Sequence, residues 1–288
     1  MRPAVFLLVG LGALSALGEA PASAADSVAF CGQTIDAKAR AVRCESPEVR
    51  DLTPLAELRG LRALYINGTG TVDLSPIAVH TRLEVLDADG TAVRDLSPIA
   101  DLQQLKLLSL DGTKVVDLSP IAGLARLEAL FIDDTQVADL TPLLELTRLQ
   151  LVHANRAPIT SLAPLRKAKK MRFLGLHRTA IADLAPLGDM RDLEFLSVGG
   201  SEVADLSPLA KMHKLKRLYL AGTKVADLSP IAGLKRLWRI TLTGTQVTDL
   251  RPLGKIRSLR QVYLRPEQVT QAEMDALREM NPRMRFFL

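Results

Sequence analysis

The side chains that could do chemistry in this chain are few: four histidines, and carboxylates scattered along the sequence. Imidazole and carboxylate groups transfer protons and bind metal ions near neutral pH. His153 and His177 are expected on adjacent strands of the repeat described below, with Asp133 nearby, and this triangle could ligate zinc. It lacks any short ligand motif, so we predict no metal site. His80, in place of a core leucine, and His213, on a basic turn, are expected to be structural or solvated.

A catalytic arrangement does not follow from the other residues either. The pattern contains no hydroxyl, histidine and carboxylate whose proximity can be inferred. The glycines Gly90, Gly112 and Gly222 recur in equivalent turns and do not form a phosphate-binding loop. We therefore expect a protein that is not an enzyme and that needs no cofactor.

A strict repeat positions these residues. Prolines recur every 22 residues without an insertion, at Pro54, Pro76, Pro98, Pro120, Pro142, Pro164, Pro186, Pro208, Pro230 and Pro252. Within each copy the apolar residues also keep their places, as they do at Leu83, Leu86, Ala88, Val93, Leu96, Ile99 and Leu102. A fixed period of this length is typical of a stacked-repeat protein.

One copy predicts the local structure of all of them. Leu86 and Ala88 alternate with polar positions, as in a short strand with one face inward. Ser97 and Pro98 follow, and they favour one brief helical or 3₁₀ turn with the serine as its N-cap. A lone coil cannot cover its apolar residues, so neighbouring coils are expected to stack with strands about 4.8 Å apart.

The pattern L-x-x-L-x-L-x-x-T-x-V-x-D-L-S-P-L-A resembles the leucine-rich repeat of the short 22-residue class, found in bacterial internalins and in a phosphatase-regulatory subunit. Ten copies cover residues 39–264. The resemblance implies an α/β repeat solenoid: a right-handed arc with a concave parallel sheet, short 3₁₀ or helical turns on the convex side, and a binding role. The position that usually carries asparagine holds Thr69, Thr91, Thr113, Thr135, Thr179, Thr223 and Thr245, with Ser201 and Ala157 in two copies. We expect the threonine hydroxyls to bond the turning backbone instead.

Both ends of the repeat are expected to be covered. Residues 1–24, with an apolar run and the sequence Ala22-Ser23-Ala24, predict a signal peptide, because the run is shorter than the ~20 residues of a membrane span. Residues 25–50 form an N-terminal cap in which Cys31 and Cys44 are predicted to form a disulfide, the alternative being two buried thiols. Residues 265–288 predict a C-terminal capping helix from a Thr270–Glu273 capping box to about Met280, and a last strand.

Charge divides the chain. Residues 25–150 hold 12 Lys and Arg against 19 Asp and Glu, a net of −7, whereas residues 151–288 hold 24 against 12, a net of +12. Such asymmetry affects association with charged partners and not the fold. The basic half suits an anionic envelope polymer or lipid head groups, and export excludes nucleic acid from our expected partners.

Two columns of charge have a structural interpretation. One alternates in sign from coil to coil, so that neighbours can pair: Arg62, Glu84, Lys106, Glu128, Gln150, Arg172, Glu194 and Lys216. The other consists of aspartates that should repel unless each accepts backbone N–H bonds at its own turn: Asp73, Asp95, Asp117, Asp139, Asp183, Asp205, Asp227 and Asp249. We favour that role over a metal ladder.

The strand residues that point away from the core are free to vary, and they predict a partner-binding site. Aromatics and histidines gather in the middle of the expected concave face, acids before them and arginines after them. Such a surface is typical of protein interfaces, the alternative being an ordinary solvated sheet. The candidate site residues are Phe131, His153, Phe173, His177, Phe195, Tyr219, Asp111, Asp133, Arg217 and Arg239. The sixth copy breaks the pattern at Ala157 and Ser161, which suggests a functional or strained place, or drift.

The sequence therefore predicts an exported, periplasmic or secreted protein without catalytic activity that engages a protein partner through its concave sheet face. The alternative is a cell-envelope structural protein that binds an anionic polymer or lipid head groups through its basic C-terminal half.

Overall fold

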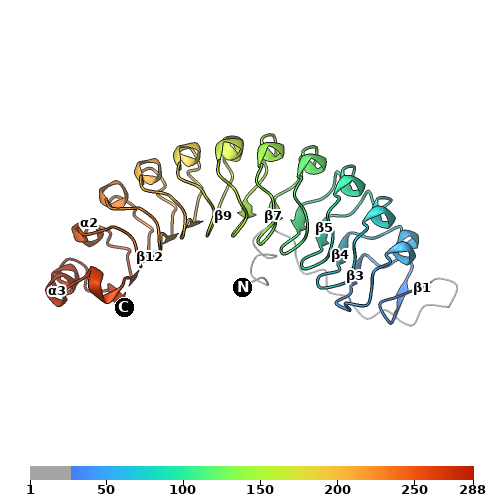
Figure 1. The fold of residues 1–288 in the computed structure, drawn as a ribbon, viewed down its shortest axis with the longest axis horizontal. Helices are drawn as coiled ribbons and strands as arrows, with labels where there is room; N and C mark the ends of the chain where they lie inside the picture. Colours follow the sequence, from blue (N-terminus) through green and yellow to red (C-terminus); the bar gives the residue numbers. More distant parts are fainter. Residues whose placement is uncertain (1–26) are drawn as a thin grey trace. The chain divides into compact units, whose positions relative to one another are not determined.

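The computed structural model describes residues 27–288 (Figure 1). These residues fold into two compact units. The first unit contains the described residues up to Val137 together with Arg148–Gln150, and the second contains Ala138–Thr147 and Leu151–Leu288. The expected signal peptide, residues 1–24, lies outside the described residues.

Short parallel strands recur through both units. The first unit contains β3 (Ala41–Arg43), β4 (Ala63–Tyr65), β5 (Val85–Asp87), β6 (Leu107–Ser109) and β7 (Ala129–Phe131). The second contains β8 (Leu151–His153), β9 (Phe173–Gly175), β10 (Phe195–Ser197), β11 (Arg217–Tyr219), β12 (Arg239–Thr241), β13 (Gln261–Tyr263) and β14 (Arg285–Phe287). Within a unit each strand pairs with the next in a 22-residue register, as Leu86 does with Leu108. Only β14 is offset, with Phe286 opposite Val262.

A single turn follows each strand of the repeats on the other side of the coil. These turns are η2 (Thr53–Glu57), η3 (Ser75–Ile77), η4 (Ser97–Ile99), η5 (Ser119–Ile121), η6 (Thr141–Leu143), η7 (Ala163–Lys167), η8 (Ala185–Leu187), η9 (Ser207–Leu209) and η10 (Ser229–Ile231). In the last repeat the short helix α2 (Arg251–Gly254) replaces the 3₁₀ turn. The prediction of a leucine-rich-repeat solenoid with a parallel sheet and short turns is confirmed.

The core is a stack of aliphatic side chains. The middle residue of each strand from β4 to β13, such as Leu86, Leu130 or Leu196, is 0% exposed, and the leucines and isoleucines that follow on the turn side are at most 3% exposed. Removing this apolar surface from water is the main favourable contribution to folding. Because each side chain packs against its equivalents one coil away, the repeats stabilise one another.

The turns are not capped as the sequence suggested. Serine was predicted as the N-cap, but a leucine such as Leu96 occupies the N-cap position and makes no side-chain cap. Ser97 lies inside the turn, and its N–H donates to Oδ1 of Asp95 at 2.8 Å. The same bond recurs at Asp73, Asp117, Asp139, Asp183, Asp205, Asp227 and Asp249. The prediction that the aspartates serve their own turns is confirmed.

These bonds lower the pKa of six of the aspartates: Asp73, Asp95, Asp117, Asp205, Asp227 and Asp249. Hydrogen bonds from the backbone and then the hydroxyl of Ser97 lower the pKa of Asp95. An ionised carboxylate is a stronger acceptor than a neutral one, which favours the turn conformation. In the sixth copy Ser161 takes the place of the aspartate, and its hydroxyl accepts the N–H of Ala163 at 3.2 Å.

Buried threonines close the turn on the other side of each strand. The Thr91 hydroxyl, 3% exposed, donates to the carbonyl of Ala88 at 2.7 Å. Equivalent bonds to the carbonyl three residues earlier are made by Thr69, Thr113, Thr135, Thr179, Thr223 and Thr245. The prediction that threonine can replace the usual asparagine is confirmed. Ala157 has no hydroxyl, and the buried Ser201 Oγ has no hydrogen-bond partner among the described residues.

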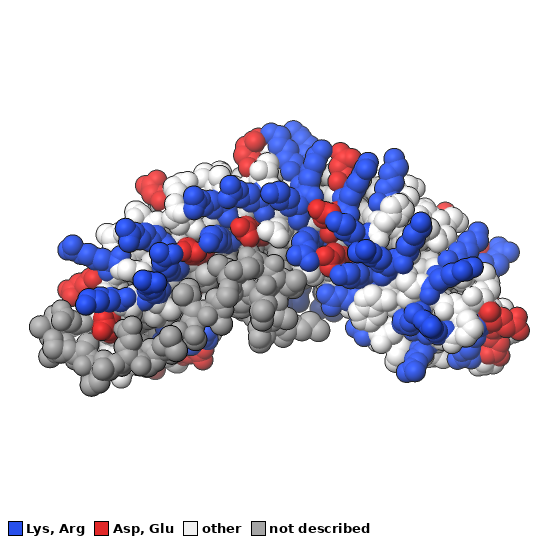
Figure 2. Space-filling model, turned by 180° about the vertical axis from the view of Figure 1, so that it is seen from behind, with Lys and Arg blue, Asp and Glu red and all other residues white. Residues whose placement is uncertain are grey.

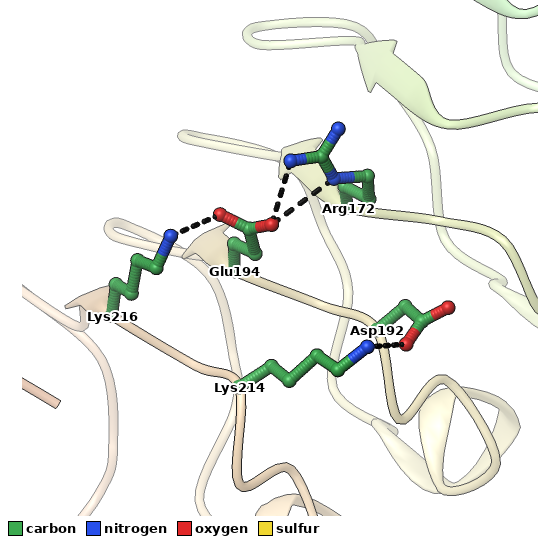
Figure 3. Close-up of polar contacts among 5 residues, drawn as sticks. All are labelled: Arg172, Asp192, Glu194, Lys214 and Lys216. Atoms are coloured by element: carbon green, nitrogen blue, oxygen red, sulfur yellow. Dashed lines mark hydrogen bonds and ion pairs between the residues drawn. The ribbon is translucent and has the colours of Figure 1, made fainter. Parts of the chain in front are cut away.

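Ion pairs link successive coils. Glu194 accepts hydrogen bonds from Arg172 at 2.7 Å and Lys216 at 2.6 Å (Figure 3). Burial raises the pKa of Glu194, but the bonds from Lys216 and Arg172 outweigh it, so that the pKa is lowered. In the first unit Glu84 lies in the same way between Arg62 and Lys106, at 2.7 Å from each. The predicted pairing of the alternating column is confirmed for these coils.

A hairpin and a disulfide cover the first repeat. Strands β1 (Ser27–Phe30) and β2 (Gln33–Asp36) pair antiparallel, and the Cys31–Cys44 disulfide ties the hairpin to the residue after β3. The predicted disulfide is confirmed. The Cys44 N–H also donates to the carbonyl of Tyr65 on β4, at 2.8 Å, which places the cap on the sheet.

At the C-terminal end, η11 (Pro266–Gln268) leads into helix α3 (Gln271–Met280), which begins with the predicted capping box. The N–H of Thr270 donates to Oε2 of Glu273 at 2.8 Å, and the N–H of Glu273 donates to the Thr270 hydroxyl at 3.3 Å. After the helix, the buried Asn281 side chain donates to the carbonyls of Ile256 and Leu259 at 3.1 and 3.0 Å. These bonds position β14 beside β13.

His80 is a histidine buried in the core. It occupies a position that is leucine in the next coil, is 3% exposed, and its Nε2 has no hydrogen-bond partner among the described residues. Burial lowers the pKa of His80, and a backbone hydrogen bond with Leu55 opposes this only partly. The folded protein therefore holds His80 neutral at pH 7.

The hydrogen bonds of the buried threonines predict that removing one hydroxyl lowers the stability of the protein. Thr113→Val keeps the size of the side chain but leaves the carbonyl of Leu110 without its hydroxyl donor, so we expect a loss of about 1–2 kcal/mol in the free energy of unfolding. Urea unfolding measures it. The matched control is the exposed Thr248→Val, which should change stability by less than about 0.5 kcal/mol. Equal losses for the two variants would contradict the role of the buried hydroxyl.

The burial of His80 predicts that the stability of the folded protein depends on pH. Because its pKa in the folded state lies below the ordinary value of 6.5, the unfolded chain binds more protons as the pH falls through that range, and stability falls. His80→Leu should remove this contribution, so its stability advantage over the wild type should be larger at pH 5.5 than at pH 7.5 in urea unfolding. The exposed His213→Gln variant should follow the wild type. An advantage independent of pH would refute the account.

Candidate functional site

In the second unit the sheet has one face buried in the core, and on strands such as β10 and β11 the other face is open. The middle residue of a strand points inward, and the residues on either side of it point to the open face; on β10 these are Phe195 and Ser197 around the buried Leu196. Side chains on the open face are not fixed by core packing. They can therefore vary from coil to coil, and this is where binding residues are expected.

Aromatic rings lie side by side on the open face of the second unit. The centre of the Phe195 ring is 5.3 Å from that of Tyr219 and 6.3 Å from that of His153. Farther along the sheet the rings of Tyr263 and Phe287 stack 4.6 Å apart. Parallel register causes this, because it places Ser197, Tyr219, Thr241, Tyr263 and Phe287 opposite one another on successive strands.

Two arginines lie among these rings. The guanidinium of Arg217 is 4.9 Å from the centre of the Phe195 ring, and that of Arg239 is 5.3 Å from Tyr263. Arg239 also donates to the Tyr219 hydroxyl at 3.3 Å and to Oε1 of Gln261 at 2.6 Å. Among the described residues neither guanidinium forms an ion pair with a carboxylate. Each guanidinium thus lies close to a ring while N–H donors remain available.

Phe173 lies on β9, and His177 lies just after this strand. Phe173 pairs in register with Phe195, and its ring centre is 5.5 Å from the guanidinium of Arg172. The N–H of His177 donates to Oδ1 of Asn155 at 2.7 Å. Burial, and then the positive charge of Arg178, lower the pKa of His177. We name the seven residues His153, Phe173, His177, Phe195, Arg217, Tyr219 and Arg239 the aromatic–arginine row.

Small residues make room for the two histidines of the row. A Cβ at Gly175 would lie 3.0 Å from Cδ2 of His153, and one at Gly199 would lie 3.1 Å from Nδ1 of His177. Both distances are shorter than ordinary van der Waals contact. The glycines therefore fix how closely each imidazole approaches the neighbouring strand.

The remaining candidates lie in the first unit and have structural partners of their own. Oδ1 of Asp111 accepts the N–H of Asp133 at 2.7 Å, and Oδ1 of Asp89 accepts the N–H of Asp111 at 2.8 Å. These carboxylates hold adjacent coils together in addition to any role in binding. Phe131 lies on β7 and is 7% exposed, and its part in binding stays a prediction.

Sequence reasoning missed the far end of the surface. Tyr263 lies in the same column of the sheet as Tyr219. Phe287 extends this column onto β14, which the sequence assigned only to the terminal cap. The interval between these two residues is 24 and not 22, so a search at fixed period does not align them. The register of β13 and β14 supplies the alignment that the period could not.

The sixth and seventh coils of the repeat carry backbone strain near this surface. The turn after the strand uses glycine with φ of about +70° in most other coils, as at Gly200 and Gly222, whereas the fifth coil has Asp134 there with φ of 57°. Arg156 and Arg178 adopt φ of 61° and 56° at the equivalent positions. A side chain in this left-handed region costs about 1 kcal/mol or more. The strain lies beside His153 and His177, where the sequence pattern also breaks.

Metal and membrane chemistry find no support in the part of the chain that the structure describes. Within residues 27–288 no three His, Cys, Asp or Glu side chains lie together so that they could hold a metal ion. In the same range no helix has the length and apolar character that crossing a bilayer requires.

Comparison with solved structures places the fold. An internalin (InlF) from Listeria monocytogenes superposes with a TM-score of 0.80 at 21% identity, over 89% of this chain and 76% of its own. Internalin C2 from the same organism is 30% identical over 73% of this chain and 83% of its own, with a TM-score of 0.54. This chain belongs to the internalin-like leucine-rich-repeat proteins.

Other comparisons are more distant. The leucine-rich-repeat ectodomain of the Arabidopsis thaliana receptor kinase GASSHO1/SCHENGEN3, solved in complex with Casparian strip integrity factor 2, has a TM-score of 0.65 at 16% identity. It matches 75% of this internalin-like chain and 28% of the receptor ectodomain. Neither a scan against protein-family models nor a search of curated proteins gives a match.

The environment of His177 predicts its titration. Because burial and Arg178 both disfavour the imidazolium, the pKa of His177 should lie below 6.5, and Arg178→Gln should raise it. Two-dimensional NMR of the imidazole resonances across pH 4.5–8.5 measures both. The Lys214→Gln variant, which removes a positive charge elsewhere in the second unit, should leave the pKa unchanged. A pKa of His177 at or above 6.5 in the wild type would contradict the described surroundings.

Proposed function

We propose that this internalin-like protein is exported and binds a protein partner through the open face of its second unit, without catalysis. The observation that supports this most directly is the aromatic–arginine row, in which half-buried rings lie beside arginines that have no acidic partner within residues 27–288. Tyr263 and Phe287 extend the proposed surface. Asp111 and Asp133 belong to the first unit, and their proposed part is to attract the partner electrostatically.

Residue type favours a protein as the partner. Tyrosine, phenylalanine and arginine are enriched at protein interfaces and dominate their binding energy, whereas lysine and glutamate are depleted there. The row contains the first group and none of the second. Because rings such as Phe195 and Tyr219 are already packed against one another, little side-chain entropy is lost on binding.

The arginines specify the chemistry of the partner more closely. Arg217 and Arg239 lie close to the rings of Phe195 and Tyr263, and each retains N–H donors that no described carboxylate satisfies. A guanidinium in this position recognises a carboxylate in a two-pronged geometry. We infer that the bound part of the partner carries Asp, Glu or a terminal carboxylate next to an apolar residue.

The family and the disulfide support the rest of the proposal. Membership in the internalin-like proteins indicates a protein-binding scaffold, and a related repeat ectodomain was solved with a bound factor. The Cys31–Cys44 disulfide is consistent with an oxidising compartment outside the cytosol, where such bonds persist. The apolar N-terminal segment predicted as a signal peptide agrees with export.

Mutations on the open face test the proposed site. A partner is first captured from envelope extract and identified, and its affinity for purified protein is measured by calorimetry. Phe173→Ala and Tyr219→Ala should each weaken binding by about 1–3 kcal/mol, because each removes a ring from the row. Thermal unfolding should change little, since neither ring is in the core.

Two further variants sharpen this test. Arg239→Lys keeps the charge but loses the planar group, so it should also weaken binding if the arginine recognises a carboxylate. Charge reversal at Lys211 or Lys235, which lie after the turns η9 and η10, is the control and should leave the affinity unchanged. If the reversals abolish binding while Phe173→Ala does nothing, the open face is not the site.

A further inference from the structure

The strongest concentration of charge in the second unit lies where the chain runs from each turn to the next strand. We call this the basic flank; it consists of five equivalent segments, residues 166–172, 188–194, 210–216, 232–238 and 254–260. They hold 14 Lys and Arg against 3 Asp and Glu, a net of +11. The equivalent segments of the first unit, 56–62, 78–84, 100–106 and 122–128, hold 5 against 4.

The segments form one continuous surface across the coils. The N–H of Glu194 donates to the carbonyl of Arg172 at 2.8 Å, and the N–H of Lys216 donates to that of Glu194 at 2.9 Å. Side chains also bridge neighbouring segments: Lys214 pairs with Asp192 at 2.5 Å, beside the Glu194 cluster (Figure 3). Successive coils are about 4.8 Å apart at the strand, so their cations follow one another closely.

Most of the cations on the flank are not neutralised. Five of the fourteen pair with a carboxylate: Lys167, Lys169, Arg172, Lys214 and Lys216. The other nine have no carboxylate partner among the described residues: Arg166, Lys170, Arg191, Lys211, Lys235, Arg236, Lys255, Arg257 and Arg260. All nine but Arg260 are exposed. Lys and Arg outnumber Asp and Glu on the face of the molecule seen in Figure 2.

We propose that the basic flank of the second unit binds a linear phosphate-linked polymer laid across successive coils. Cations that recur from coil to coil match a chain that carries a negative charge on every unit. Each contact displaces counterions from the chain, which gives a favourable and salt-dependent free energy of binding. This surface is separate from the aromatic–arginine row, and the proposal does not depend on the protein-binding function.

A single small anion or a membrane fits the flank less well. The unpaired cations come from five different coils, so they do not converge on one point as the donors of a phosphate site would. Proteins that lie on a membrane usually insert apolar side chains between the lipids. The large apolar side chains that are exposed in residues 27–288 are Val72, Val79, Val116, Met280, Phe287 and Leu288, and none belongs to the flank.

Two triple variants with equal loss of charge test the proposal. The flank variant carries Lys235→Gln, Arg236→Gln and Lys255→Gln, which break no described ion pair. The control carries Arg178→Gln, Arg265→Gln and Arg283→Gln, which also break no described ion pair and lie outside the flank, after β9, after β13 and before β14. Circular dichroism and thermal unfolding first establish that both remain folded. Binding to inorganic polyphosphate of defined chain lengths is then measured at several salt concentrations.

The wild type should bind long polyphosphate more tightly than tripolyphosphate, because a longer chain reaches more coils. The flank variant should bind the long chain at least tenfold more weakly, and the slope of log K against log salt should fall by about 2–3, one for each lost contact. The control should change affinity by less than twofold. The flank variant should bind the protein partner of the aromatic–arginine row as tightly as the wild type, which would show that the two surfaces act separately.

Three outcomes would overturn the proposal. Equal weakening of both triple variants would mean that only the net charge matters. Tripolyphosphate bound as tightly as the long polymer would mean a local anion site. Retention of the protein by vesicles of anionic phospholipid, with no binding of free polyphosphate, would mean that the flank recognises a membrane surface.

Discussion

Each coil depends on hydrogen bonds that it cannot make with itself. A strand of three residues has no partner within its own repeat, so its N–H and C=O groups are satisfied by the strands 22 residues before and after it. Buried backbone groups must be paired, and one extra residue would turn the inward leucines outward. This explains why the prolines keep their interval without an insertion. Only at the last strand, beyond helix α3, does the interval relax.

Polar side chains form hydrogen bonds with the backbone groups at the bends, which the strands leave unpaired. At one bend an aspartate such as Asp95 accepts an N–H of the following turn, and at the other a threonine such as Thr91 donates to a carbonyl. Both bonds are made within one coil, so they recur in each copy without constraining its neighbours. Side chains on the open face and on the basic flank are therefore not needed for these bonds. That freedom allows one coil to present Phe195 and another Arg239 from equivalent places on the same scaffold.

The sequence predicts the fold well because one 22-residue period extends over residues 39–264. Ten copies of one pattern identify strands, turns and core together, and the disulfide follows from two cysteines beside the open end. Local details are harder. Serine is a common N-cap, yet here Leu96 takes that position because Asp95 reaches the turn from outside it. The pairing of Tyr263 with Phe287 required the register of a strand that breaks the period. The basic flank emerges only when charge is counted by place in the coil and not along the chain.

The substitutions around the sixth copy affect how the stack comes apart. Repeat proteins open by nearest-neighbour steps, so the least stable coil sets where a break begins. Arg156 holds a left-handed backbone that glycine adopts elsewhere, and Ala157 lacks the buried hydroxyl. Amide hydrogens there should exchange with solvent sooner than those of coils with Gly222 and Thr223, which have both features. Under mechanical tension this coil would be the first to unravel, and the segments on either side would remain as separately folded blocks.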